Sequence, residues 1–183
     1  MNHSAQLIRA CINGDRTSQN FLYREYAAKM FGVCLRYSKN REEAEEILQE
    51  GFVQVFRSLS NYKYSGSFEG WIRRIMVNCA IQQYRARPKL HLITGITGAE
   101  MQEAVDAEII SGLQHKDLLK MVQALPPGYR VVFNLHVFEG LKHREIAEAL
   151  GISEGTSKSN FYDARLLLKR ALQESTKIAE HYG

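Results

Sequence analysis

The 183-residue sequence has no long apolar run and only three prolines. Its purely apolar stretches are a few residues long, whereas a membrane-spanning helix needs roughly 20. The N-terminus also lacks the basic and then apolar layout of a secretory signal peptide. We therefore expect a cytoplasmic protein without membrane insertion.

Cysteine is scarce as well. Cys11, Cys34 and Cys79 are odd in number, lie far apart and each fall within an apolar helical pattern. Such cysteines are typical of reduced thiols buried in a core rather than of a disulfide framework.

Patterns that would indicate an enzyme are missing. The six histidines have no metal-ligand spacing with one another or with the cysteines. Neither a nucleophile elbow nor a phosphate-binding loop occurs. We therefore expect no catalytic residue, no metal and no cofactor.

Charge is unevenly distributed although the formal net charge is only +4. The segment 71–99 contains no acidic residue, whereas glutamates crowd the segment 42–50. This asymmetry indicates two different partners. The basic residues of the first segment are Arg73, Arg74, Arg85, Arg87 and Lys89.

No alternating strand pattern appears, so we predict an all-α fold of two small helical domains. Asp15 and Asn40 are positioned to cap a long helix and an acidic helix, and a loop at 61–70 precedes a third helix. Pro88 ends that third helix. We place the first domain at residues 1–88, a flexible linker at 89–105 and the second domain at 106–183.

The second domain contains the spacing of a helix-turn-helix. The pair Pro126-Pro127 breaks one helix, and three more are predicted at 129–137, 143–150 and 153 to about 175. Ala147 permits a close helix crossing, Gly151 can adopt a positive φ, and Ser153 can cap the last helix. The spacing alone also fits a plain helical hairpin. Candidates to face a major groove are Thr156, Lys158, Ser159, Tyr162 and Asp163.

Three segments together resemble the sigma-70 family of RNA polymerase sigma factors, specifically its small extracytoplasmic-function (ECF) members. Segment 42–52 is similar to the family's acidic helix, 68–78 to its promoter-melting helix, and 151–159 to the opening of its minus-35 recognition helix. The resemblance implies a sigma-2 helical bundle followed by a sigma-4 helix-turn-helix. It also implies a non-enzymatic subunit that binds core RNA polymerase and directs promoter recognition, DNA melting and initiation.

The resemblance assigns roles to matched positions. The implied partners are the clamp helices of the largest polymerase subunit, the flap of the second largest, promoter DNA and an anti-sigma factor. The loop 62–68 would hold a base flipped from the minus-10 element. Polymerase would contact Glu45, Glu46, Gln49 and Glu50; the minus-10 element would contact Tyr64, Ser65, Ser67, Arg73, Arg74, Asn78 and Gln82; the minus-35 element would contact Thr156, Lys158, Ser159, Tyr162 and Asp163.

Some positions depart from the family pattern. Ser157 stands where relatives generally have valine or isoleucine, and its hydroxyl can bond to the backbone instead. Asp163 stands where relatives often have arginine, and a carboxylate near DNA is repelled unless it accepts from a cytosine amino group. Gln82 stands where some relatives have asparagine.

Two other classes of protein remain as alternatives at this point. A helix-turn-helix regulator that does not replace the sigma subunit would bind duplex DNA alone, but it would leave the acidic helix unexplained. A nucleic-acid-modifying enzyme would need a catalytic carboxylate cluster or a metal site, and a cleavage assay with a divalent metal would detect it.

Overall fold

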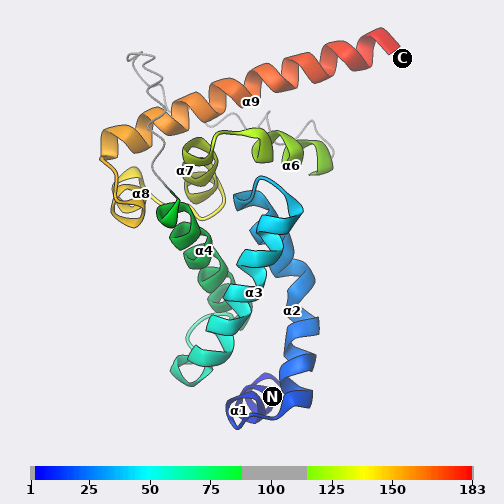
Figure 1. The fold of residues 1–183 in the computed structure, drawn as a ribbon, viewed down its shortest axis with the longest axis vertical. Coiled ribbons are helices and arrows are strands. Elements are labelled where there is room, and N and C mark those ends of the chain that lie inside the picture. Colours follow the sequence, from blue (N-terminus) through cyan, green and yellow to red (C-terminus); the bar gives the residue numbers. More distant parts are fainter. Residues whose placement is uncertain (1–2, 88–114, 183) are drawn as a thin grey trace. The chain divides into compact units, whose positions relative to one another are not determined.

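A computed structural model describes residues 3–87 and 115–182, with side chains for 5–87 and 117–175 (Figure 1). Every regular element in these ranges is a helix, which confirms the all-α prediction. The chain divides into two compact units, Met1–Gln83 and Tyr84–Gly183, which we describe separately. The expected linker at 89–105 and the expected helix start near Asp106 lie outside the described residues.

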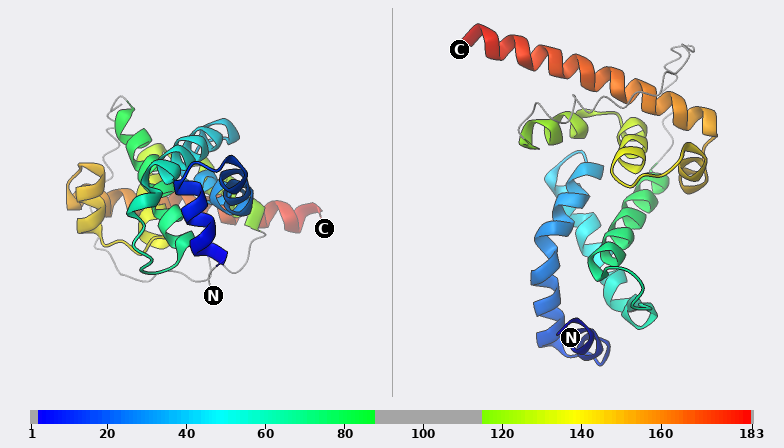
Figure 2. Two further views of the ribbon diagram at one scale, coloured as in Figure 1. Left: turned by 90° about the horizontal axis from the view of Figure 1, so that it is seen from below. Right: turned by 180° about the vertical axis from the view of Figure 1, so that it is seen from behind.

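The first unit is built on two long helices that pack side by side (Figures 1 and 2). They are α2 (Arg16–Tyr37) and α3 (Arg41–Ser58), and α4 (Phe68–Ala86) completes the core. The short 3-10 helix η1 (Leu59–Asn61) leads from α3 toward the loop before α4. The largest fully buried side chains here are Ile8, Leu22, Met30, Leu59, Ile72 and Met76.

The two predicted helix caps of this unit are present. The Asp15 carboxylate accepts from the backbone N–H of Ser18 at 2.9 Å, and the Asn40 side chain accepts from the N–H of Glu43 at 3.0 Å. Each cap satisfies a backbone donor that has no partner within the helix. The N-terminal ends of α2 and α3 are therefore capped by the residues that the sequence indicated.

The helix α1 (His3–Ile12) was not predicted. It packs on α2 through Ile8 and Cys11, both buried, and Gly14 turns the chain with φ +83°. A short helix gains most of its stability from such tertiary contacts. Its sequence pattern alone was therefore too weak to reveal it.

The second unit contains α6 (His115–Ala124), α7 (Pro127–Val137), α8 (His143–Leu150) and α9 (Glu154–Tyr182). Pro127 occupies the first turn of α7, where a missing N–H costs nothing. α9 packs against both α7 and α8 (Figure 2). It continues to Tyr182, beyond the end predicted near Ser175. The core of this unit includes Val122, Val132, Leu135, Ile146 and Leu168.

Candidate functional site

The helix-turn-helix has the turn that its sequence predicted. Gly151 ends α8 with φ +66°, in the left-handed region that favours glycine. The N–H of Ile152 donates to the carbonyl of Ala147 at 3.1 Å and closes the turn. Phe161, Ala164 and Leu168 are buried, as expected for the packed side of α9. The opposite side of α9 is thereby left to face outward.

Three of the five candidate DNA-reading residues, Thr156, Lys158 and Ser159, are exposed on that side and have polar groups that are already engaged. The Ser153 hydroxyl accepts from the N–H of Thr156 at 2.9 Å and lies 2.8 Å from the Thr156 hydroxyl. Ser159 donates to the carbonyl of Thr156 at 3.1 Å, and Lys158 Nζ lies 2.8 Å from Glu154 Oε1. The first turns of α9 are thus an ordered array of donors and acceptors. Sequence reasoning did not single out Glu154, although its spacing of four residues from Lys158 is a readable signal.

The remaining two candidates on α9 differ in exposure. Tyr162 is exposed, whereas Asp163 is only half-exposed. Ser157 is completely buried, and its Oγ lies 3.0 Å from Nδ1 of His143. This bond gives the buried hydroxyl a partner on α8.

The loop before α4 has a defined conformation. Tyr64 has φ +57°, unusual for a residue other than glycine, and Gly66 has φ +81°. The Tyr62 hydroxyl donates to the carbonyl of Gly66 at 3.1 Å, and Ser67 Oγ accepts from the N–H of Gly70 at 3.0 Å. The loop is therefore held at both its middle and its end.

Aromatic rings gather around this loop. The Tyr62 ring centroid lies 4.9 Å from that of Tyr64, 5.0 Å from that of Phe68 and 5.3 Å from that of Trp71. Tyr64 is 53% exposed, so its ring offers an accessible face beside the packed aromatic side chains. Ser65 and Ser67 are exposed beside it. Such a platform suits stacking with an unpaired base.

The helix α4 follows this loop, and one of its faces is exposed and polar. Arg74, Asn78 and Gln82 are all exposed and recur every four residues, so they form a row along the helix. Arg73, also predicted as a site residue, is half-buried. The row carries one positive charge and two amides that can both donate and accept. Its chemistry suits a phosphate backbone and base edges.

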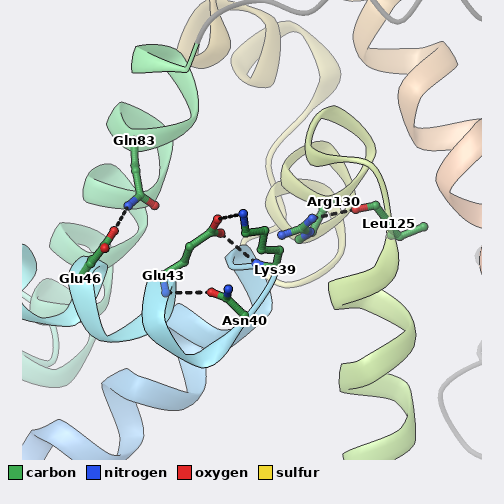
Figure 3. A network of polar contacts seen from close by, with 7 residues as sticks. All are labelled: Lys39, Asn40, Glu43, Glu46, Gln83, Leu125 and Arg130. Carbon is green, nitrogen blue, oxygen red and sulfur yellow. Dashed lines mark hydrogen bonds and ion pairs between the residues drawn. The ribbon is translucent and has the colours of Figure 1, made fainter.

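The acidic face of α3 is partly organised by neighbouring side chains (Figure 3). Glu46 Oε2 accepts from Gln83 Nε2 of α4 at 3.2 Å, a contact that sequence reasoning missed. Glu45 pairs with Arg41 at 2.7 Å, and Glu50 accepts from Gln54 at 2.9 Å. Gln49 is exposed between them. Figure 3 also shows Glu43 turned back to Lys39, away from this outward face.

Comparison with known proteins identifies both units. The family model described as Sigma-70 region 2 matches residues 22–89, and the one described as Sigma-70, region 4 matches residues 115–168. The chain belongs to the sigma-70 family. The two sigma-70 regions occur in the order that the sequence resemblance implied. The region 2 match begins in the first unit and extends six residues past Gln83, and the region 4 match lies in the second unit.

Individual sigma factors match over most of the chain. RNA polymerase sigma-H factor of Pseudomonas aeruginosa is 26% identical over 92% of this chain and 93% of its own length. ECF RNA polymerase sigma factor SigE of Mycolicibacterium smegmatis is 32% identical over 87% of this chain and 63% of its own length. Sigma factor RpoE of Bartonella quintana, solved in complex with the anti-sigma factor NepR, has a similar fold. It is 18% identical with a TM-score of 0.50, covering 84% of this chain and 96% of that one.

Two further properties concern the part of this sigma-70 chain that the structure describes. None of their helices is long and apolar enough to cross a membrane. Within the same ranges, no group of three or more histidine, cysteine, aspartate or glutamate side chains is arranged to hold a metal ion.

Proposed function

We propose that this chain acts as an ECF-type sigma subunit that carries core RNA polymerase to its promoters. The observation that carries this proposal is the presence of sigma-70 regions 2 and 4 in that order along the chain. An independent helix-turn-helix regulator would need the second unit alone. A sigma role gives the acidic face of α3 and the aromatic loop before α4 a function, whereas an independent regulator leaves both unexplained.

The acidic face of α3 would bind polymerase. Its carboxylates at Glu45, Glu46 and Glu50, with Gln49 among them, suit a basic surface such as the clamp helices of the largest subunit. The internal bonds of Glu45, Glu46 and Glu50 to Arg41, Gln83 and Gln54 hold the acceptors in place before docking. The second domain would meet the flap of the second-largest subunit.

The loop before α4 and the exposed row on α4 would capture the melted minus-10 strand. A base that has left the duplex exposes a π-face, and the Tyr64 ring offers an exposed surface for stacking. Ser65, Ser67, Asn78 and Gln82 supply hydrogen-bonding groups, and Arg73 and Arg74 supply positive charge toward the phosphates.

The outward face of α9 would read the minus-35 duplex. N-terminal residues of a recognition helix contact base edges in the major groove. Thr156, Lys158 and Ser159 lie at this end, with Tyr162 and Asp163 one turn further along. Residues 1–88 would thus serve polymerase and the minus-10 element, residues 106–183 the minus-35 element, and residues 89–105 the connection between them.

The same role implies a protein that is not an enzyme and that works in the cytoplasm, where polymerase and promoters are. The relative from Bartonella quintana was solved with an anti-sigma factor. By analogy, we propose that an anti-sigma factor binds this chain as well.

Run-off transcription tests the proposal. Core RNA polymerase would transcribe a promoter library with and without this protein. Initiation that depends on the protein, at templates sharing two spaced elements, supports a sigma function. Binding to duplex DNA without polymerase, together with no new initiation, would instead support an independent regulator.

A further inference from the structure

Glu154 and Lys158 form an ion pair at the start of α9, with Oε1 and Nζ 2.8 Å apart. Their side chains are 49% and 47% exposed, so both remain accessible. Residues four apart lie on the same side of a helix. The pair therefore presents a negative and a positive group together at the end of the helix that enters a major groove in helix-turn-helix proteins.

The carboxylate of this pair is ionised at neutral pH. The hydrogen bond from Lys158 lowers the pKa of Glu154, and the charge of Lys158 and the neighbouring His143 and Arg144 act in the same direction. An ionised carboxylate only accepts hydrogen bonds, and an ammonium group only donates them. Because one ammonium donor suffices for the ion pair, Lys158 keeps further donors and Glu154 further lone pairs for a ligand.

A G·C base pair presents the complementary pattern. In the major groove the guanine O6 acceptor lies next to the cytosine N4 donor, and these atoms are hydrogen-bonded to each other at about 2.9 Å. The ion pair places a donor and an acceptor 2.8 Å apart. Its two groups can therefore face the two base atoms without the ion pair being broken.

We propose that Glu154 is a specificity-determining residue that, with Lys158, reads one G·C pair of the minus-35 element. Lys158 donates to guanine O6 or N7, and Glu154 accepts from cytosine N4. This inference rests on the proposed function, since it requires α9 to enter the major groove of a promoter.

An A·T pair offers the same two groups less favourable contacts. In an A·T pair the donor is on the purine and the acceptor on the pyrimidine. Placing Glu154 on the adenine amino group brings its carboxylate beside the N7 acceptor. Lys158 then donates to thymine O4, but the thymine methyl group lies beside it where guanine would offer N7 as a second acceptor. A carboxylate facing phosphates alone is repelled. Glu154 thus narrows the set of sequences that Lys158 alone would accept.

The test uses full-length protein with core polymerase and promoters in which each minus-35 base pair is varied singly. We expect the wild type to prefer G·C at one position. Glu154→Gln should reduce that preference roughly tenfold and leave the other positions unchanged. Lys158→Met should weaken the preference at the same position.

Glu148→Gln is the matched control. Glu148 is exposed and pairs with Arg144 four residues earlier on α8, at 3.5 Å, so its substitution removes the same charge from a similar pair. We expect its base-preference profile to match the wild type. Melting curves for all variants check that each protein is folded.

Two outcomes would overturn the inference. One is a Glu154→Gln protein that changes initiation equally at every base, as a general charge effect would. The other is a wild-type profile that either shows no preference for G·C at any minus-35 position or shows one that Glu154→Gln leaves unchanged. Failure of the proposed function looks different, since wild-type protein would then support no polymerase-dependent initiation at all.

Discussion

Nδ1 of the His143 imidazole lies 3.0 Å from the hydroxyl of Ser157, which is completely buried. The His143 ring also stacks on His136, with centroids 4.6 Å apart and planes inclined by 11°. An isolated buried hydroxyl would be costly, and this contact satisfies it. The bond therefore explains how α9 tolerates a polar residue at a completely buried position.

We predict that His143 and Ser157 are energetically coupled. Ser157→Ala leaves a ring nitrogen without this partner and should destabilise the second unit by about 1–2 kcal/mol. His143→Phe keeps a stacking ring but should cost a similar amount. The double variant should cost less than the sum, with a coupling of about 1 kcal/mol.

Amide hydrogen exchange in α8 and α9 measures this coupling, because it reports local unfolding of one unit. Ser159→Ala, which removes an exposed hydroxyl from the same helix, should change the free energy of opening by less than about 0.5 kcal/mol. Strictly additive effects of the two substitutions would contradict the coupling.

Two helical glycines should respond in opposite directions to alanine. A Cβ added at Gly51 of α3 would lie 2.8 Å from Cε of Met76 and closer still to its Sδ, and Met76 is fully buried. A Cβ at Gly32 of α2 would meet nothing within 4 Å. Gly32→Ala should therefore stabilise the first unit by up to about 1 kcal/mol. Gly51→Ala should destabilise it by about 1 kcal/mol, since overpacking outweighs the gain in helix propensity.

Urea unfolding followed by fluorescence of Trp71, the only tryptophan, measures both effects. Each glycine serves as the control for the other, because the chemical change is the same. Equal shifts in both variants would show that Met76 moves aside at no cost.

The sequence predicted the elements whose signals are local. Asp15, Asn40, Gly151 and Ser153 are residue types that cap or end helices, and each does so here. Their effect depends on a few neighbouring residues only. The same holds for the buried side of α9, which follows from helical spacing.

Features that depend on packing could not be predicted in this way. The contacts of Glu46 with Gln83 and of Lys29 with Glu69, at 3.2 and 2.7 Å, join different helices. The bond between His143 and Ser157 depends on how α8 and α9 cross. The positive φ of Tyr64 has no local signal either, because tyrosine does not favour that region.

The thiols of Cys34 and Cys79 should be inert in the folded protein. Burial raises the pKa of Cys34 to about 12 and that of Cys79 to about 11. Since the thiolate is the reactive form, a thiol reagent at pH 8 should label both much more slowly in native protein than in urea.

The raised pKa values of Cys34 and Cys79 also determine how the stability of the first unit depends on pH. The folded state holds these protons more tightly than the unfolded state, so the stabilisation is complete below the ordinary thiol pKa near 9 and is lost as the pH rises above it. Cys34→Ser and Cys79→Ser variants, labelled and unfolded in parallel, assign the effect to each site. Fast native labelling of either thiol would contradict its burial.

The acidic face of α3 should contribute to polymerase affinity through charge. Glu46→Gln with Glu50→Gln removes two exposed carboxylates and keeps their shape. Affinity for core polymerase should fall several-fold at low salt, and the difference should shrink at high salt because exposed charges are screened. Glu174→Gln on α9 removes an exposed carboxylate elsewhere and should have no such effect. Unchanged holoenzyme assembly by the double variant would exclude this surface.

Tyr64 allows its structural and DNA-binding contributions to be separated. A residue other than glycine at φ +57° carries a backbone cost of about 1–2 kcal/mol. Its ring is 53% exposed and lies against Tyr62, so it adds little to the core. Tyr64→Gly should therefore leave the stability of the first unit unchanged or slightly raised, as measured by Trp71 fluorescence.

The same variant should impair promoter melting. Stacking of an unpaired base on an aromatic ring contributes about 1–3 kcal/mol, so open-complex formation should fall roughly tenfold in Tyr64→Gly. Fluorescence of 2-aminopurine placed in the minus-10 element reports this step. Tyr64→Phe, which keeps the ring, should melt the promoter nearly as well as the wild type. If Tyr64→Gly melts the promoter as well as the wild type, the Tyr64 ring does not hold the base. Relief of backbone strain would not by itself replace the lost stacking.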